Sequence, residues 1–114
     1  MFQEVKSMLP VSGDEYDQEI ILQIQACALD LTTSAEITLP GTIAISRNAT
    51  TGVVTDNSTL TDALIIVAIA TWCNMRIGNP PNYDNLLKAY ESIKGQLRIS
   101  RTYTEYEPEE ADGE

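Results

Sequence analysis

Apolar residues recur at helical spacing in four stretches of the chain. The first is residues 2–9, an amphipathic segment that ends at Pro10. The second is residues 14–31. Its apolar residues follow the spacing i, i+4, i+8, i+11 and i+15 on one helical face: Tyr16, Ile20, Ile24, Cys27 and Leu31. Ile21 and Leu29 widen this face. The last is residues 83–97, with an apolar face of Leu86, Leu87, Tyr90, Ile93 and Leu97. These periods predict amphipathic helices packed around a common core.

The remaining stretch, residues 60–77, differs because it is apolar on nearly every side. Its run from residue 63 to 73 contains a single polar residue, Thr71. Thr59 and Asp62 have the spacing of a capping box and predict the helix start, while Gly78 and the following prolines predict its end. Such a helix must be covered on almost all sides, either by a tightly packed core or by neighbouring subunits.

Residues 32–59 have a different pattern, rich in threonine and poor in charge. Residues 42–46 and 53–55 are β-like, and residues 48–52 have the composition of a turn. A structureless loop of this length is unusual in a compact domain. We therefore predict a small hairpin or a long ordered loop inserted between two helices, presenting a binding surface.

The C-terminal part continues into an alternating segment, residues 97–106, which predicts an extended strand. Its bulky side chains fall on one face: Leu97, Ile99, Arg101 and Tyr103. Because a strand needs a partner, this arm must pair with the predicted hairpin or with another chain. Tyr103 and Tyr106 are either anchors for a partner or contacts to the body of the protein.

Together these patterns predict a mainly α protein. A small bundle of about four helices with a β-like hairpin insertion at residues 34–58 makes a domain of residues 1–97. Residues 98–114 make an extended C-terminal arm and an acidic tail, which has six acids in the ten residues from Glu105 and is expected to be disordered.

Composition narrows the function. The 114 residues carry 17 acids and 7 bases, a net charge of −10, which argues against gripping DNA but suits a wall that DNA slides past. Histidine is absent, which removes the usual base of nucleophilic dyads and most zinc or iron sites. No phosphate-binding glycine loop or calcium loop is present. We therefore predict no enzyme and no cofactor or metal.

Several single features have an ordinary structural interpretation. Cys27 and Cys73 lie in apolar helices and are predicted to be buried free thiols rather than a disulfide or ligand pair, which fits a reducing cytoplasm. Trp72 is predicted to lie in the core or in an oligomer interface. The N-terminus is too short and polar for a signal peptide, and the longest apolar run is too short to cross a membrane.

The order of these elements resembles the head-tail connector (adaptor) family of tailed double-stranded DNA phages, also described as head-completion or DNA-packaging proteins. The resemblance covers about residues 2–104, and three segments carry it: DLTTSAEITLPGTI at 30–43, TDNSTLTDALIIVAIATWCNMRIGNPPNYDNLLKAY at 55–90 and QLRISRTY at 96–103. The acidic tail is not part of the family pattern.

This resemblance implies a structural protein of the virion neck, made in the cytoplasm of a bacterial host. It implies a homo-oligomeric ring, a dodecamer in the virion, beneath the portal protein, with a channel for double-stranded DNA and a docking surface for the next head-closure (stopper) or tail protein. The implied portal-docking residues are Leu97, Ile99, Arg101, Tyr103 and Tyr106. The implied subunit contacts are Ile43, Ile45, Val53 and Trp72.

Two other classes are compatible with parts of the sequence. A small acidic regulator or DNA mimic would need its acids arrayed on a folded surface, whereas here six lie in the tail and four in the first turn of one helix, at Asp14, Glu15, Asp17 and Glu19. Another virion ring protein, such as a head-closure or tail-terminator protein, is expected to be mostly β, which the helical periodicity contradicts.

Overall fold

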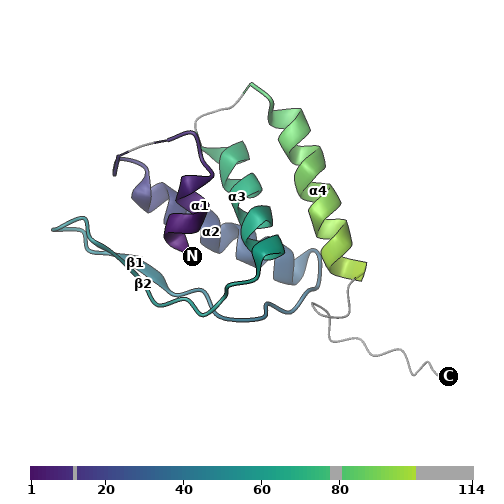
Figure 1. Ribbon diagram of the computed structural model, residues 1–114, viewed down its shortest axis with the longest axis horizontal. Coiled ribbons are helices and arrows are strands. Elements are labelled where there is room, and N and C mark those ends of the chain that lie inside the picture. The colour runs from purple at the N-terminus through teal and green to yellow at the C-terminus, as the bar shows by residue number, and fades with distance from the viewer. Residues whose placement is uncertain (12, 78–80, 100–114) are drawn as a thin grey trace.

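The structure is a computed structural model that describes residues 1–11, 13–77 and 81–99 (Figure 1). In this part of the chain the elements are α1 (Phe2–Ser7), α2 (Asp17–Thr33), β1 (Ile45–Arg47), β2 (Val54–Asp56), α3 (Ala63–Arg76) and α4 (Tyr83–Ile99). The protein is thus a mainly helical bundle with a two-stranded antiparallel hairpin, which confirms the predicted fold class.

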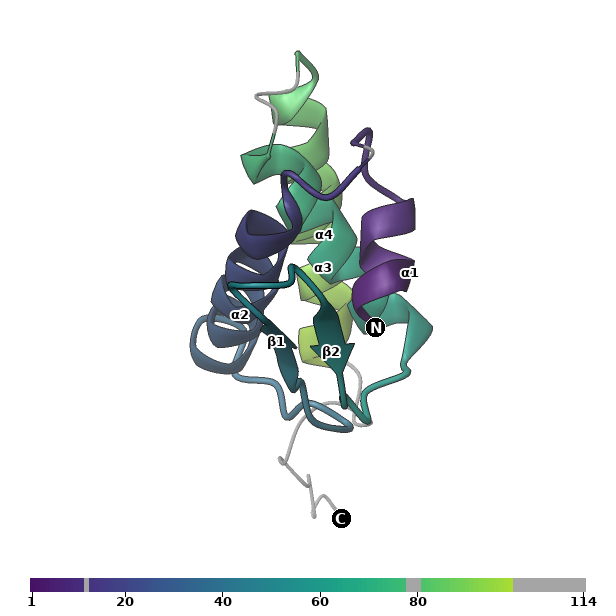
Figure 2. The same ribbon diagram turned by 90° about the vertical axis from the view of Figure 1, so that its left-hand side faces the viewer.

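Helix α3 lies at the centre of the bundle and packs against α1, α2 and α4. In Figure 2, α2 lies at one side of the molecule and α1 at the other, with α3 and α4 between them. Seven residues of α3 are buried: Ile65, Ile66, Ala68, Ile69, Ala70, Cys73 and Met75. The apolar run is therefore covered mainly within the single chain, which favours the packed core over burial by neighbouring subunits. Val67 is an exception, with 39% of its surface exposed.

The start of α3 differs from the predicted capping box. The N-cap is Asp62, whose carboxylate accepts a hydrogen bond from the backbone N–H of Ile65 at 3.1 Å. Thr59 instead accepts a hydrogen bond from the N–H of Thr42 at 2.8 Å and so joins the two ends of the insertion. The predicted start at residue 60 was wrong because tertiary pairing takes up the Thr59 hydroxyl.

Helix α2 begins at Asp17 rather than at residue 14, and its N-cap is Tyr16. Asp17 does more than complement the helix dipole, because its side chain is buried and accepts a bond from the Lys6 ammonium at 2.7 Å. This ion pair fastens the short helix α1 to the start of α2. A buried carboxylate requires such a partner, since an unpaired charge in the core is strongly destabilising.

Helix α4 continues through Ile99, so Leu97 and Ile99 are helical and do not belong to an extended strand. The prediction of an arm beginning at Leu97 was wrong for these residues. Leu97 lies one heptad after Tyr90, on the same helical face, and both side chains are buried. Burial of Leu97 against the core therefore extends the helix by another half-turn. The rest of the predicted arm, from residue 100, lies outside the described residues.

The predicted hairpin is confirmed, with Ile45 opposite Asp56 and Arg47 opposite Val54. Its turn is held by Asn48, whose side-chain oxygen accepts the N–H groups of Thr50 and Thr51. Backbone pairing continues past the strands, because the N–H groups of Thr59 and Leu60 both donate to the Thr42 carbonyl, at 3.0 and 3.1 Å. Residues 42–60 therefore form one long, antiparallel excursion from the bundle.

Gly41 lies where this excursion leaves the bundle, close against the backbone of residue 60. A β-carbon at Gly41 would come within 2.7 Å of the Leu60 α-carbon and 2.8 Å of its nitrogen. We expect Gly41→Ala to lower the free energy of unfolding by about 1–3 kcal/mol, since the two backbones must separate. Gly95→Ala is the control: its β-carbon would meet nothing within 4 Å, and alanine should stabilise α4 by about 0.5–1 kcal/mol.

Urea denaturation of both variants measures this difference. Equal stability of the Gly41 and Gly95 variants would show that the approach of residues 41 and 60 does not constrain the fold.

Candidate interaction surfaces

The hairpin residues predicted to contact a neighbouring subunit do not share one environment. Ile45 is 7% exposed and belongs to the core, and Ile43 is partly buried against it. Val53 is 59% exposed at the start of the returning segment. Of these three side chains, Val53 is therefore the one most available to a partner.

Trp72 lies where α2, α3 and α4 meet. Its indole N–H donates to the Gln23 side-chain oxygen at 3.0 Å, and its ring meets the Tyr90 ring edge-on at 5.3 Å. The Arg76 guanidinium lies over the indole ring, 4.1 Å from the ring centre. The side chain is partly buried, and these contacts place it in the protein's own packing.

A polar cluster below Trp72 joins α2 to α4. The Asp30 carboxylate accepts hydrogen bonds from the Tyr90 hydroxyl at 2.6 Å and from the Lys94 ammonium at 3.1 Å. The Cys27 thiol donates to the Tyr90 oxygen at 3.7 Å. Burial, reinforced by the Asp30 carboxylate, raises the pKa of Tyr90 far above its usual value, so the phenol remains protonated. The cluster pairs these polar side chains with one another and joins α2 to α4.

Both cysteines are free and buried, as predicted. Burial raises the pKa of each thiol to about 12, because the thiolate loses its hydration inside the apolar core. Since the thiolate is the reactive form, Cys27 and Cys73 are inert at neutral pH.

A second polar contact fastens the hairpin to the N-terminus. The Asp56 carboxylate accepts a bond from the Met1 ammonium at 2.8 Å and one from the backbone N–H of Phe2 at 2.7 Å. It also accepts the N–H of Ser58 at 3.0 Å. Partial burial works to raise the pKa of Asp56, but these hydrogen bonds outweigh it and hold the pKa well below its usual value. Desolvation works to lower the pKa of the Met1 ammonium, and its bonds to Asp56 and Glu4 raise it.

These two shifts predict how stability depends on pH. The depressed pKa of Asp56 contributes stability above pH 3.8, its ordinary value, and that contribution is lost as the pH falls further. The raised pKa of the Met1 ammonium contributes stability below pH 8.0, and that contribution is lost as the pH rises above this value. We expect Asp56→Asn to lower the melting temperature at pH 6 and to flatten both limbs of the pH profile.

Thermal melts between acid and mildly alkaline pH check this prediction. Glu4→Gln is the control, since Glu4 also meets the Met1 ammonium, at 2.9 Å, but is 58% exposed and should contribute little. Identical pH profiles for the Asp56 variant and the unaltered protein would contradict it.

The residues predicted to dock on the portal protein do not share one environment in the structure. Leu97 is fully buried, so its side chain is part of the protomer's core rather than of an accessible docking surface. Ile99, by contrast, is 84% exposed at the end of α4, the largest exposure among the described large apolar residues. Arg101, Tyr103 and Tyr106 lie outside the described residues.

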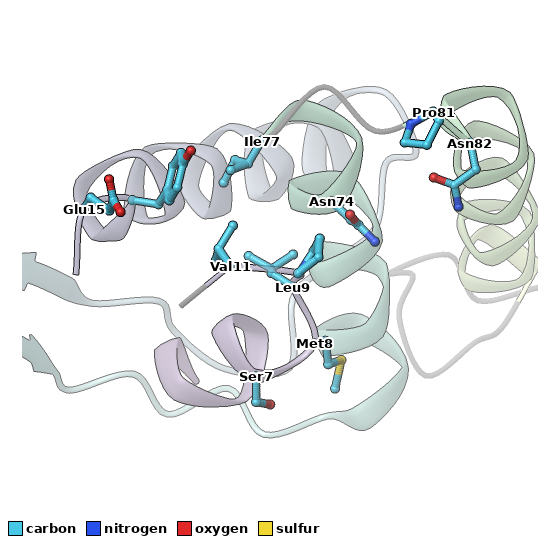
Figure 3. A pocket seen from close by; sticks show the side chains of 11 residues that line it. Ser7, Met8, Leu9, Val11, Glu15, Asn74, Ile77, Pro81 and Asn82 are labelled. Carbon is cyan, nitrogen blue, oxygen red and sulfur yellow. The ribbon is translucent and has the colours of Figure 1, made fainter. Parts of the chain in front are cut away.

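A surface hollow of about 910 Å³ lies between the end of α1, the loop after it and the junction of α3 with α4 (Figure 3). Leu9, Val11 and Ile77 give it an apolar lining. Of the described lining residues, Glu15 is the one that is charged at neutral pH. Tyr16 adds a phenolic hydroxyl to this lining.

The apolar periodicity of the sequence did not predict that the outer face of α2 carries exposed leucines. Leu29 was expected to widen the buried face, but it is 63% exposed, and Leu22 is 54% exposed. The core face of α2 is narrower than expected because the fully buried positions are Ile20, Ile24, Cys27 and Leu31, and a stripe of this spacing leaves Leu29 outside it. The spacing of Leu22 and Leu29, seven residues apart, could have signalled a second apolar face.

The described part of the chain contains no cluster of three or more His, Cys, Asp or Glu residues that could hold a metal ion. None of its helices combines the length and apolarity that crossing a bilayer requires.

Comparison with known proteins identifies the family. The family model described as "Phage connector protein" matches residues 1–104, which is most of the chain. Neither the curated proteins nor the solved structures gave a match. The matched region includes all of the described helices and both strands, and it ends just before the acidic residues of the tail. The chain therefore belongs to the phage connector protein family, which indicates a structural role at the head-tail connection of a phage particle.

Proposed function

We propose that this protein forms a ring beneath the portal protein, a dodecamer in the virion neck, through which double-stranded DNA passes. The far side of the ring would receive the next head-closure (stopper) or tail protein. The observation that carries the proposal is the match of residues 1–104 to the phage connector family. The helical protomer, with a core completed mainly by its own chain, supports assembly from folded subunits.

The distribution of charge also supports this proposal over an acidic regulator. Three aspartates of the folded part are occupied by internal partners: Asp17 by Lys6, Asp30 by Lys94, and Asp56 by the Met1 ammonium. A DNA mimic needs its acids displayed on the surface as a substitute for phosphates. Exposed acids of the folded part gather near the start of α2, at Asp14, Glu15 and Glu19, and others, such as Glu36 after α2, lie apart from this group.

The proposal predicts two properties that size-exclusion chromatography with light scattering can measure. The protein is run alone, and then mixed with the portal protein of the same phage. We expect either a ring in isolation or co-elution with the portal. A strict monomer that does not bind the portal would overturn the proposal and favour the acidic regulator.

A further inference from the structure

Two surface strips, one on α2 and one on α3, lack charged side chains and consist of apolar residues and threonines. On α2 the strip follows the spacing i, i+4, i+7 and i+11 and consists of Leu22, Ala26, Leu29 and Thr33. On α3 it follows i, i+4 and i+8 and consists of Ala63, Val67 and Thr71. The α2 strip is about 16 Å long and the α3 strip about 12 Å, given the rise of a helix.

The hydroxyl groups within both strips are turned inward. Thr33 donates to the Leu29 carbonyl at 2.6 Å, and Thr71 donates to the Val67 carbonyl at 2.8 Å. Each threonine therefore satisfies its hydroxyl on its own helix, which leaves its methyl group as the available surface. The strips consequently offer mostly aliphatic contacts, although both lie on the surface of the protomer.

Each strip lies on the side of its helix that is opposite a fully buried residue. On α2 the strip is opposite the side that carries Ile24, which is fully buried, and on α3 it is opposite the side that carries Ile69, also fully buried. The helices α2 and α3 pack against each other, so each turns a buried side inward and leaves its strip at the surface. Figure 2 shows α2 at one side of the bundle, with α3 between it and α1.

We propose that the α2 strip of one protomer packs on the α3 strip of a second copy of this chain, as the repeating contact of the ring. Leucines 22 and 29 are the protruding residues of this contact, and the small side chains of Ala63, Val67 and Thr71 receive them. The inference rests on the proposed function, because it names the surfaces by which that ring is built.

Charge identifies the occupant as a second copy. The net charge of −10 makes copies repel one another at a distance, so an uncharged surface favours close contact between them. A basic protein or a nucleic acid would be recognised through charges, which neither strip has. A contact between two different faces is heterologous, and when its rotation closes it generates a ring rather than a two-fold dimer.

Cysteine cross-linking of the full-length protein tests the contact. Leu29→Cys and Val67→Cys are made singly and together and treated with a short bismaleimide, with the portal protein present if the ring requires it. The unaltered protein is the blank, since Cys27 and Cys73 are both fully buried. Ala49→Cys, on the exposed turn of the hairpin, replaces Leu29→Cys in a control for random collisions.

The expected result is a cross-linked dimer when the two single variants are mixed, and a ladder of higher oligomers from the double variant. Neither single variant should cross-link to itself. Leu29→Glu should weaken ring formation by at least about tenfold, because it places a charge in an uncharged contact.

Two other results would overturn the inference and can be told apart. If the unaltered protein forms its ring but the 29–67 pair cross-links no better than the 49–67 pair, the contact is wrong and the ring stands. If no ring forms and the portal is not bound, the proposed function fails, and the inference fails with it.

Discussion

Replacing Tyr90 by alanine is expected to lower the free energy of unfolding by about 3–5 kcal/mol. Tyr90 is 1% exposed, and its ring fills the space between α2, α3 and α4. Removing it leaves a cavity beside Trp72 and leaves Cys27 without its hydrogen-bond acceptor. The Asp30 carboxylate would also lose its shortest hydrogen bond, although Lys94 remains.

Urea denaturation followed by circular dichroism measures the decrease in the free energy of unfolding. Two further variants show how much of it depends on the hydroxyl and on the buried position of Tyr90. Tyr90→Phe keeps the ring and removes the hydroxyl, so it should cost about 1–2 kcal/mol. Tyr83→Ala, on the same helix, is the matched control, since Tyr83 is 40% exposed and should contribute much less. If the Tyr90 and Tyr83 alanine variants are equally stable, the junction of the three helices does not depend on Tyr90.

The periodicity of apolar residues predicted the helices because it reflects burial directly. Tyr90 was placed on the buried face of its helix, and the structure puts it in the centre of the core. The hairpin followed from β-branched residues on both sides of an asparagine-containing turn, and Asn48 holds that turn through its side chain. Both signals are local, so a single sequence contains them in full.

What the sequence did not reveal depends on partners that are distant along the chain. The sequence predicted a capping box that begins at Thr59, but Thr59 pairs with Thr42, and Asp62 caps the helix. The ion pair of Asp30 with Lys94 joins residues 64 positions apart, and nothing near either residue indicates it. The burial of Ile45, a predicted subunit contact, was hidden for the same reason, because the fold turns that side chain into its own core.

The C-terminal end of α4 also depends on tertiary contacts, because its residues could form either a strand or a helix. An alternating pattern from Leu97 onward predicts a strand, yet the same residues also continue the apolar face that includes Tyr90. Burial of Leu97 favours the helix, which extends to Ile99. The interface candidates therefore shift outward from the core: Leu97 stabilises the protomer, whereas Ile99 is exposed where α4 ends.

A truncation after Ile99 is expected to abolish binding to the portal protein and to leave the protomer folded. The cut keeps Leu97 and the whole described core, so the free energy of unfolding should change by less than about 0.5 kcal/mol. The removed segment holds Arg101, Tyr103 and Tyr106, the remaining members of the predicted docking arm. Pull-down on immobilised portal protein measures binding, and circular dichroism measures folding.

The position of the cut decides what the experiment means. A cut after Gly95 would remove Leu97, which is fully buried, so any loss of binding could come from a weakened core. A cut after Tyr106 removes the acidic end of the tail and keeps the predicted arm, and this variant should bind as the full chain does. Binding by the 1–106 chain but not by the 1–99 chain therefore assigns docking to residues 100–106. Equal binding by both truncated chains would exclude the arm and leave the folded bundle, with Ile99 at its end, as the surface that meets the portal.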